Sequence, residues 1–226
     1  MKILIINPNS DAQMTEAILE LARGFVGERY QVDCLSTPGS PPFIETYQDE
    51  AAAAPGMLKL TKEHQKRVDA FIVACHCDPN LDLLKEVSAK PVVGIGEASM
   101  KMASMLGHRF SVISATTQSI PNKEVLIQRY HLQNHLASIR APRRDREGPC
   151  TRDTYLKMAR QAVTEDGAEV IVLGCAGMAG LDKYLQKELD IPVLDGIICA
   201  LILASGMVEY GISISKRRRY AGGGMG

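Results

Sequence analysis

The fold is decided by two stretches of the chain, Phe71-Ile72-Val73-Ala74-Cys75-His76-Cys77-Asp78-Pro79 and Val170-Ile171-Val172-Leu173-Gly174-Cys175-Ala176-Gly177. In each, a short run of apolar, β-branched residues continues without alternation and stops at a cysteine. This pattern is typical of a strand that is buried on both faces of a parallel sheet. Open α/β sheets bind their ligands at the carboxyl ends of the strands. We therefore expect Cys75 and Cys175 to lie at ligand-binding edges.

The residues after Cys75 predict the start of a helix. Asp78 suits the N-cap position and Pro79 the first helical position. Cys75 would then lie close to a helix N-terminus, where partial positive charge and backbone N–H groups favour a thiolate.

The two stretches also belong to an internal repeat. A second short strand, led by proline, begins 16 residues after Cys75 at Pro91 and 17 residues after Cys175 at Pro192. Apolar strands that end in small polar residues open the chain and recur at residues 109–115. We infer two similar α/β halves with one cysteine each. The first covers residues 1–98, with 205–226 packing back on it, and the second covers residues 99–204.

Composition narrows the functional classes. The chain has 226 residues, of which 46% are hydrophobic, and its 26 basic residues equal its 26 acidic residues. This balance provides no overall field that would draw the chain to nucleic acid or to a membrane. No signal peptide and no apolar run of membrane-spanning length stand in the sequence, so a cytoplasmic location is expected. In that compartment the six cysteines are expected to be reduced thiols.

The sequence also predicts the local structure of several other segments. Asn7-Pro8-Asn9-Ser10 follows the first strand as a turn, and Ser10 or Asp11 can cap the next helix. A helix is predicted from about residue 48 to 60, with a possible break near Pro55. Residues 140–148 are predicted to form a charged loop, and the basic run at 216–219 a solvated tail.

Four cysteines other than the two at the strand ends are expected to be small buried residues. They are Cys34, Cys77, Cys150 and Cys199.

Two cysteines at a shared site suggest three kinds of chemistry. Zinc would need at least three protein ligands, and only His76 and Cys77 lie close to Cys75 in the sequence. A redox pair of Cys75 and Cys77 is a second possibility, although its spacing differs from the usual Cys-x-x-Cys. The third is acid–base catalysis across a planar intermediate. One cysteine would remove a proton next to a carbonyl while the other donates a proton to the opposite face.

Five motifs, taken together, give the sequence a family resemblance. They are Asn7-Pro8-Asn9-Ser10, Ile44-Glu45-x-Tyr47-x-Asp49-Glu50, Ala74-Cys75-x-x-Asp78-Pro79, Pro91-Val92-Val93-Gly94-Ile95-Gly96-Glu97-Ala98 and Leu173-Gly174-Cys175-Ala176-Gly177-Met178, where x is a position outside the match. In this order they resemble the Asp/Glu/hydantoin racemase superfamily, and most closely its hydantoin and allantoin racemase branch. The resemblance implies two pseudo-symmetric flavodoxin-like α/β halves with parallel sheets, and an active site in the cleft between them. It also implies that Cys75 and Cys175 are the catalytic pair, without cofactor or metal.

The sequence departs from the family pattern after the first cysteine. His76 and Cys77 stand where an aromatic and a small residue are common, and Asn80 stands where glycine is usual. These side chains would border the pocket and bear on the choice of substrate. For His76 we favour a neutral imidazole that satisfies a backbone group over a role in tuning Cys75.

The function predicted from sequence is a cofactor-independent racemase of 5-substituted hydantoins, with allantoin as one candidate. Backbone N–H groups at strand ends would stabilise an enolate-like oxygen, and Ile44 would contact the ring substituent. The expected substrate-binding residues are Asn9, Ser10, Ile44, Thr116, Thr117, Ala176 and Gly177. The partner is a small molecule, and we expect a homo-oligomer.

Three alternatives stay open at this point. A racemase of aspartate or glutamate would need cationic or several polar groups for a second carboxylate. A decarboxylase of the same fold can work with a single cysteine, so two cysteines argue against it. From a different class, the chain would be a ligand-binding or thiol redox α/β protein whose cysteines transfer no proton.

Overall fold

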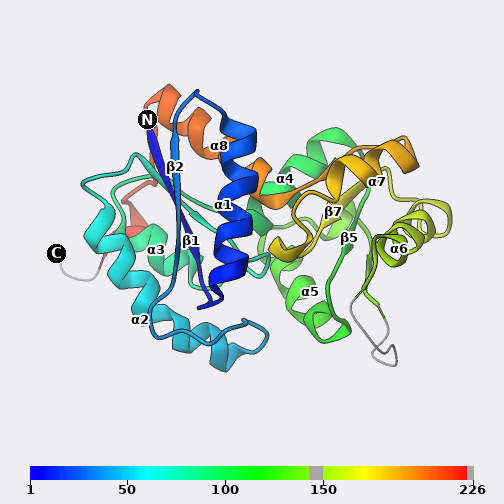
Figure 1. Cartoon of the computed structure of the whole chain (residues 1–226), viewed down its shortest axis with the longest axis horizontal. Coiled ribbons are helices and arrows are strands. Elements are labelled where there is room, and N and C mark those ends of the chain that lie inside the picture. Colours follow the sequence, from blue (N-terminus) through cyan, green and yellow to red (C-terminus); the bar gives the residue numbers. More distant parts are fainter. Residues whose placement is uncertain (143–149, 223–226) are drawn as a thin grey trace. The chain divides into compact units, whose positions relative to one another are not determined.

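The computed structural model describes residues 1–142 and 150–222, which divide into two compact units (Figure 1). Unit 1 contains residues 1–95 and 200–226, and unit 2 contains residues 96–199. The expected domain boundaries at residues 98 and 204 fall a few residues from these. Most of the predicted charged loop at 140–148 and the last four residues of the glycine-rich end lie outside the described residues.

Unit 1 is built on four parallel strands in the order β2-β1-β3-β4. Its elements in chain order are β1 (Lys2–Asn7), α1 (Ala12–Val26), β2 (Gln31–Ser36), α2 (Tyr47–His64), β3 (Ala70–Val73), α3 (Leu81–Val87) and β4 (Val92–Gly94), followed after unit 2 by most of α8 (Gly196–Tyr210) and a short 3-10 helix η4 (Arg218–Tyr220).

Unit 2 repeats this plan with the parallel order β6-β5-β7-β8. Its elements are α4 (Ile95–Leu106), β5 (Phe110–Ile113), η1 (Thr117–Ser119), α5 (Ile120–Arg129), η2 (Gln133–His135), β6 (Leu136–Arg140), α6 (Arg152–Thr164), β7 (Val170–Leu173), η3 (Ala176–Met178), α7 (Asp182–Leu189), β8 (Val193–Leu194) and the start of α8.

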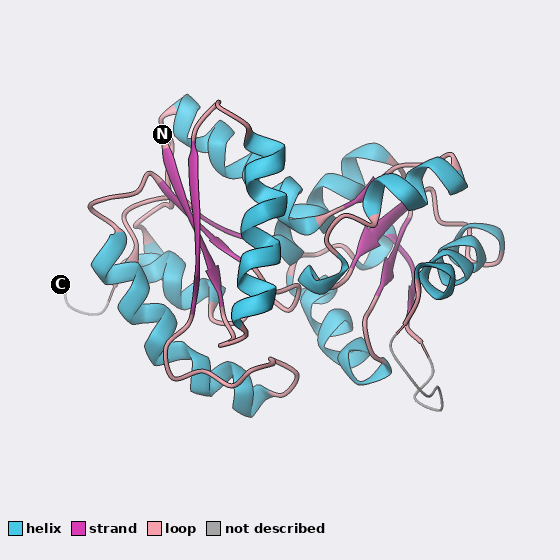
Figure 2. Cartoon of the chain, in the orientation of Figure 1, coloured by secondary structure: helices cyan, strands magenta, loops and turns pink. Residues whose placement is uncertain are grey.

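The two sheets therefore share one strand order, which is the flavodoxin-like order over its first four strands. Figure 2 shows the strands of each unit as a layer flanked by helices. The predicted α/β fold with two similar halves is confirmed. No helix among the described residues combines the length and the apolar character needed to cross a bilayer.

The packing of unit 2 explains why the sequences of the inner strands are unbroken apolar runs. Phe110, Val112, Val170 and Val172 pack with residues of α4 and α5 in one cluster. The alternate residues of the same strands, such as Ile113 and Ile171, pack with residues of α6 and α7 in another. Because both faces of the sheet are covered by helices, every position of β7 is buried.

The predicted break of α2 near Pro55 is wrong. The helix continues through Pro55 from Tyr47 to His64, although proline cannot donate a backbone hydrogen bond there. The next residue explains why packing keeps the helix in place. A Cβ atom on Gly56 would lie 2.3 Å from the Pro38 carbonyl oxygen, so the helix backbone rests directly on the loop after β2. The contact between α2 and this loop thus outweighs the tendency of Pro55 to break the helix.

All four residues of the basic run are exposed, as the interpretation of a solvated tail requires, but Lys216 of the run and Tyr220 directly after it also contact α3. The Lys216 ammonium donates to the carbonyl oxygens of Lys85 (2.6 Å) and Glu86 (2.9 Å) at the C-terminal end of that helix. The Tyr220 hydroxyl lies 2.8 Å from Oδ1 of Asp82 on the same helix. A cation at a helix C-terminus meets the negative end of the dipole, so these contacts hold the segment against unit 1.

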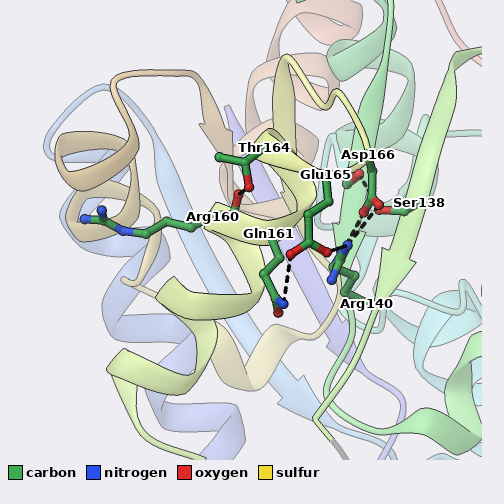
Figure 3. A network of polar contacts seen from close by, with 8 residues as sticks. Ser138, Arg140, Arg160, Gln161, Thr164, Glu165 and Asp166 are labelled. Atoms are coloured by element: carbon green, nitrogen blue, oxygen red, sulfur yellow. Dashed lines mark hydrogen bonds and ion pairs between the residues drawn. The ribbon is translucent and has the colours of Figure 1, made fainter.

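A polar network ties β6 to the turn that follows α6 (Figure 3). The Arg140 guanidinium donates from Nε (2.6 Å) and Nη2 (2.9 Å) to the two carboxylate oxygens of Asp166, and from Nη2 to Glu165 (2.7 Å). The two-pronged hydrogen bond is the geometry in which arginine binds carboxylates most strongly. It raises the pKa of Arg140 and lowers that of Asp166. Arg140 therefore ends a strand rather than opening the predicted loop.

Asp195 links the end of β8 to α8 as a buried cap. Its Oδ1 accepts hydrogen bonds from the backbone N–H groups of Ile197 (2.8 Å) and Ile198 (3.3 Å), while the residue is 5% exposed. Burial raises the pKa of this carboxyl from 3.8 to about 6, and the nearby charge of Asp182 adds to the increase.

Asp195 should make the stability of the protein fall as pH rises from about 4 to about 6. In this window the folded chain holds the Asp195 proton more tightly than the unfolded chain, so deprotonation costs folding free energy. The Asp195→Asn variant keeps an acceptor at the cap but does not titrate. We expect its free energy of unfolding, relative to the parent, to rise by up to about 3 kcal/mol between about pH 4 and about pH 8.

Urea unfolding curves at both pH values measure this difference. The matched control is Asp190→Asn, because Asp190 is an exposed residue with a left-handed backbone (φ 55°), which asparagine also tolerates. The expectation is contradicted if the difference in unfolding free energy between Asp195→Asn and the parent is the same at both pH values.

Candidate active site

Cys75 lies two residues beyond β3, an inner strand of the unit 1 sheet. A turn follows it at once, in which the Asp78 backbone N–H donates to the Cys75 carbonyl oxygen (2.9 Å). The turn brings the Cys77 side chain back to the same point, with the two sulfur atoms 3.2 Å apart. Both cysteines are half-buried, and His76 between them is 1% exposed. The expectation that Cys77 is buried is therefore wrong.

The predicted helix start at Asp78 and Pro79 is also wrong. Asp78 has a left-handed backbone (φ 47°), and α3 begins at Leu81 after a second left-handed residue, Asn80 (φ 57°). The Asp78 side chain is buried instead against the end of β4, where a Cβ on Gly94 would lie 2.3 Å from its Oδ1. Cys75 is thus positioned by a tight turn and a buried carboxyl group. Asparagine tolerates the left-handed conformation that glycine adopts freely, which explains how Asn80 can stand there.

Hydrogen bonds within unit 1 fix the Asn7–Ser10 loop at the end of β1. Asn9 is 5% exposed, and its Oδ1 accepts hydrogen bonds from Asn7 Nδ2 (2.7 Å) and from the Asp11 N–H (3.0 Å). The Ser10 N–H donates to the Pro41 carbonyl oxygen (3.0 Å). The N–H groups directly after Asn9 therefore already have acceptors within unit 1. Asp11, rather than Ser10, caps α1, since its carboxylate accepts from the N–H groups of Gln13 and Met14.

Ile44 belongs to the same apolar cluster against which both Cys75 and Cys77 pack. It is 7% exposed and lies just before α2, whose first turn is fixed by a reciprocal cap between Thr46 and Asp49. Cys75 and Ile44, both predicted from the sequence to belong to the site, therefore pack in the same apolar cluster of unit 1.

Cys175 occupies the equivalent position in unit 2, two residues beyond the inner strand β7. Its Sγ accepts a hydrogen bond from the Gly177 backbone N–H (3.4 Å), at the start of η3. A backbone N–H directed at sulfur stabilises negative charge on it. Ala176 is buried and Gly177 is exposed, and both follow Cys175 directly in the chain.

Thr116 and Thr117 follow β5 and are half-buried. The loop is braced by Ser119, whose hydroxyl donates to the Thr116 carbonyl oxygen (2.8 Å) and lies 2.5 Å from the Ser114 hydroxyl. The helix α5 begins directly after this loop, with proline at its first turn.

Tyr155, on α6, was not predicted from the sequence. Its hydroxyl is hydrogen-bonded to Cys150, and both Tyr155 and Cys175 pack against the same apolar cluster of unit 2. Burial, with the nearby groups of Cys150 and Cys175, raises the pKa of Tyr155 to about 12. Tyr155 is therefore a neutral hydroxyl beside the second cysteine. Cys150 is half-buried, so the expectation that it is buried is wrong.

Lys123 is a second residue that the sequence did not single out. It is the fourth residue of α5 and 3% exposed, and no hydrogen bond or ion pair joins it to another described residue. Side chains on a helix lean towards its N-terminus. The N-terminus of α5 follows the loop that contains Thr116 and Thr117. A lysine that is so little exposed at this place could meet a negatively charged ligand near the predicted site residues Thr116 and Thr117.

The remaining cysteines are structural. Cys34 and Cys199 are 7% and 2% exposed, as expected, and burial raises the pKa of each thiol to about 12. None of the six cysteines is part of a disulfide. In residues 1–142 and 150–222, no three His, Cys, Asp or Glu side chains gather closely enough to hold a metal ion.

These features define a class of α/β protein with two equivalent sheets. In each sheet, the corresponding inner strand is followed two residues later by a half-buried cysteine. Comparison with known proteins identifies the family. Residues 3–204 match the family model "Asp/Glu/Hydantoin racemase". The chain belongs to this family, and its enzymatic class is that of the racemases, which are isomerases.

Individual relatives match along nearly the whole chain. A hydantoin racemase of Pseudomonas sp. (strain NS671) is 37% identical, covering 97% of this chain and 91% of that protein. The structure of an allantoin racemase from Klebsiella pneumoniae is similar with a TM-score of 0.93 and 32% identity, covering 100% of this chain and 95% of the other. An allantoin racemase from Pseudomonas fluorescens gives a TM-score of 0.92 with 31% identity, covering 100% and 98%.

Proposed function

We propose that the protein racemises 5-substituted hydantoins, allantoin among them, by proton transfer at C5 between Cys75 and Cys175. The observation that carries the proposal is the equivalent placement of the two thiols. Each lies two residues beyond the inner strand that occupies the same place in its sheet. The likeness to hydantoin and allantoin racemases over the whole chain supports the choice of substrate class.

The reaction needs one cysteine as thiolate and the other as thiol. The thiolate removes the C5 proton, which is acidified by the neighbouring carbonyl, and the carbanion is stabilised as a planar enolate. The thiol then donates its proton to the opposite face of C5. The product is the other enantiomer, and the two cysteines have exchanged protonation states. Because each cysteine serves as base for one enantiomer, the reverse reaction uses the same groups in exchanged roles.

The enolate oxygen requires electrostatic stabilisation. We propose that Lys123 supplies positive charge to it from the first turns of α5, beside Thr116 and Thr117. The Lys123 residue as a whole is only 3% exposed, so we propose that its charge would be less screened than that of a lysine on the open surface. A substrate that brings this charge would also compensate the burial of the lysine.

Replacing Lys123 with methionine should lower kcat/KM by about 10- to 100-fold, because a charge-stabilising group is lost. Stability should be little changed, since an apolar side chain of similar length replaces the largely buried lysine side chain. The control is Lys157→Met, at an exposed position on α6 of the same unit. Racemisation rates together with urea unfolding measure both effects. An unchanged kcat/KM for Lys123→Met in the folded protein would remove Lys123 from the proposal.

The experiment that tests the function is a panel of enantiopure hydantoins with different C5 substituents, allantoin included. Racemisation abolishes the circular dichroism of each enantiomer without changing the mass of the compound. We expect both enantiomers of at least one hydantoin to lose their signal at rates proportional to enzyme concentration. If no hydantoin reacts while the protein is folded, the substrate proposal fails.

A racemase of aspartate or glutamate is the second candidate, and Lys123 is the observation that favours it. A buried cation suits the second carboxylate of an acidic amino acid. Aspartate and glutamate enantiomers therefore belong in the same panel. Racemisation of either amino acid, with inert hydantoins, would select this candidate.

A further inference from the structure

We infer that Cys75 and Cys77 form a redox modification site, in which peroxide converts the two thiols into a reversible disulfide. Cys77 serves as the resolving thiol for the candidate catalytic Cys75. The inference goes beyond the proposed racemisation, in which Cys77 takes no part.

The turn after β3 provides the geometry. Cys75 and Cys77 are the first and third residues of a turn closed by the hydrogen bond from the Asp78 N–H to the Cys75 carbonyl oxygen. Their sulfur atoms are 3.2 Å apart, so a small side-chain rotation brings them to bonding distance. A disulfide requires Cα atoms about 4.4–6.8 Å apart, a span that residues two positions apart in a turn satisfy.

Both thiols are accessible to a small oxidant, whereas two other cysteines are protected. Cys75 and Cys77 are half-buried. Cys34 and Cys199 lie in the core, and burial raises the pKa of each thiol to about 12, which keeps them protonated and unreactive. Cys150 is half-buried and hydrogen-bonded to Tyr155. Oxidation should therefore begin at the accessible strand-end thiols.

The chemistry balances with hydrogen peroxide as the only co-reactant. The Cys75 thiolate attacks one peroxide oxygen, the O–O bond breaks and hydroxide leaves, giving a sulfenic acid. The Cys77 sulfur then attacks the Cys75 sulfur, the S–O bond breaks, and the oxygen leaves as water with the Cys77 proton. In total, two thiols are oxidised to one disulfide and one peroxide is reduced to two waters. A dithiol reductant reverses the modification by thiol–disulfide exchange.

The second step protects Cys75 from irreversible damage. Without a neighbouring thiol, a sulfenic acid is oxidised further to sulfinic and sulfonic acids, which common reductants do not restore. With Cys77 at 3.2 Å, the disulfide forms first. If Cys75 is catalytic as proposed, oxidation stops racemisation and reduction restores it.

The test exposes the full-length protein to a stepwise excess of hydrogen peroxide and follows it by peptide mass spectrometry after alkylation of the remaining thiols. The variants are Cys77→Ala and the matched control Cys150→Ala, which removes the other half-buried cysteine outside the two strand ends. In the parent and in the control, we expect the peptide containing residues 75–77 to lose two hydrogen masses and to regain them with dithiothreitol. In Cys77→Ala, we expect the same peptide to gain two or three oxygen atoms that dithiothreitol does not remove.

The inference is overturned if Cys75 in the parent gains oxygen atoms at the rate seen in Cys77→Ala, or if a disulfide joins Cys75 to another cysteine. The mass readout does not use racemisation, so its result is independent of the proposed function. Loss and recovery of racemisation, measured in parallel, tests whether the modification controls activity.

Discussion

Cys75→Ser and Cys175→Ser should each lower the rate of racemisation by about 10³-fold or more, because inversion needs a proton to leave one face of C5 and another to arrive at the opposite face. A serine hydroxyl is far less acidic than a thiol, so it replaces neither the base nor the acid. The decrease should appear in kcat with little change in stability, since both cysteines are half-buried and serine is nearly isosteric.

The matched control is Cys150→Ser, the half-buried cysteine that lies at neither strand end. It should retain racemisation within about threefold of the parent, as is usual for a residue outside the reacting groups. If one of the strand-end variants behaves like this control, the mechanism does not use two cysteines.

Gly174→Ala should be the most damaging small change near the second cysteine. A Cβ at this position would lie 2.8 Å from the Ile113 carbonyl oxygen and 2.9 Å from Cγ1 of Val112. The carbonyl belongs to the neighbouring strand and accepts the Gly174 N–H (2.8 Å), so the backbone must shift. We expect the free energy of unfolding to fall by about 1–3 kcal/mol. Because Cys175 is the next residue, kcat should fall by about 10²-fold.

The control for this change is Gly24→Ala, in the last turn of α1. A Cβ at Gly24 meets no atom within 4 Å, so the methyl group fits without strain. This variant should gain about 0.5–1 kcal/mol of stability, because alanine loses less conformational freedom on folding than glycine. Urea unfolding and racemisation rates distinguish the two variants, and equal effects of both would contradict the packing argument.

Much of the fold could be predicted from the sequence where local pattern and tertiary packing agree. The strands predicted to begin at Pro91 and Pro192 are β4 and β8, which begin one residue later, at Val92 and Val193. The apolar runs before the two cysteines identify the inner strands because helices cover both faces of each sheet. Prediction failed where contacts distant in sequence decide the conformation. The loop against Gly56 keeps α2 continuous through Pro55, and the end of β4 holds Asp78 in a turn.

The candidate site could be predicted only in part, for the same reason. Cys75 and Cys175 are marked by the strands that they end. Lys123 and Tyr155 lie on helices with mixed polar and apolar residues, where no local pattern distinguishes a buried lysine or tyrosine from an exposed one. The proximity of Cys77 to Cys75 depends on a turn, whereas the Asp-Pro sequence indicates a helix start.

The measurement that tests the central claim most directly is deuterium incorporation at C5 of each hydantoin enantiomer in heavy water. The parent should invert both enantiomers and label the product. Cys75→Ser and Cys175→Ser should each label only one enantiomer, without inversion, and the labelled enantiomer should differ between the two variants. If both variants label the same enantiomer, or if either still inverts its substrate, Cys75 and Cys175 are not the two bases of the reaction.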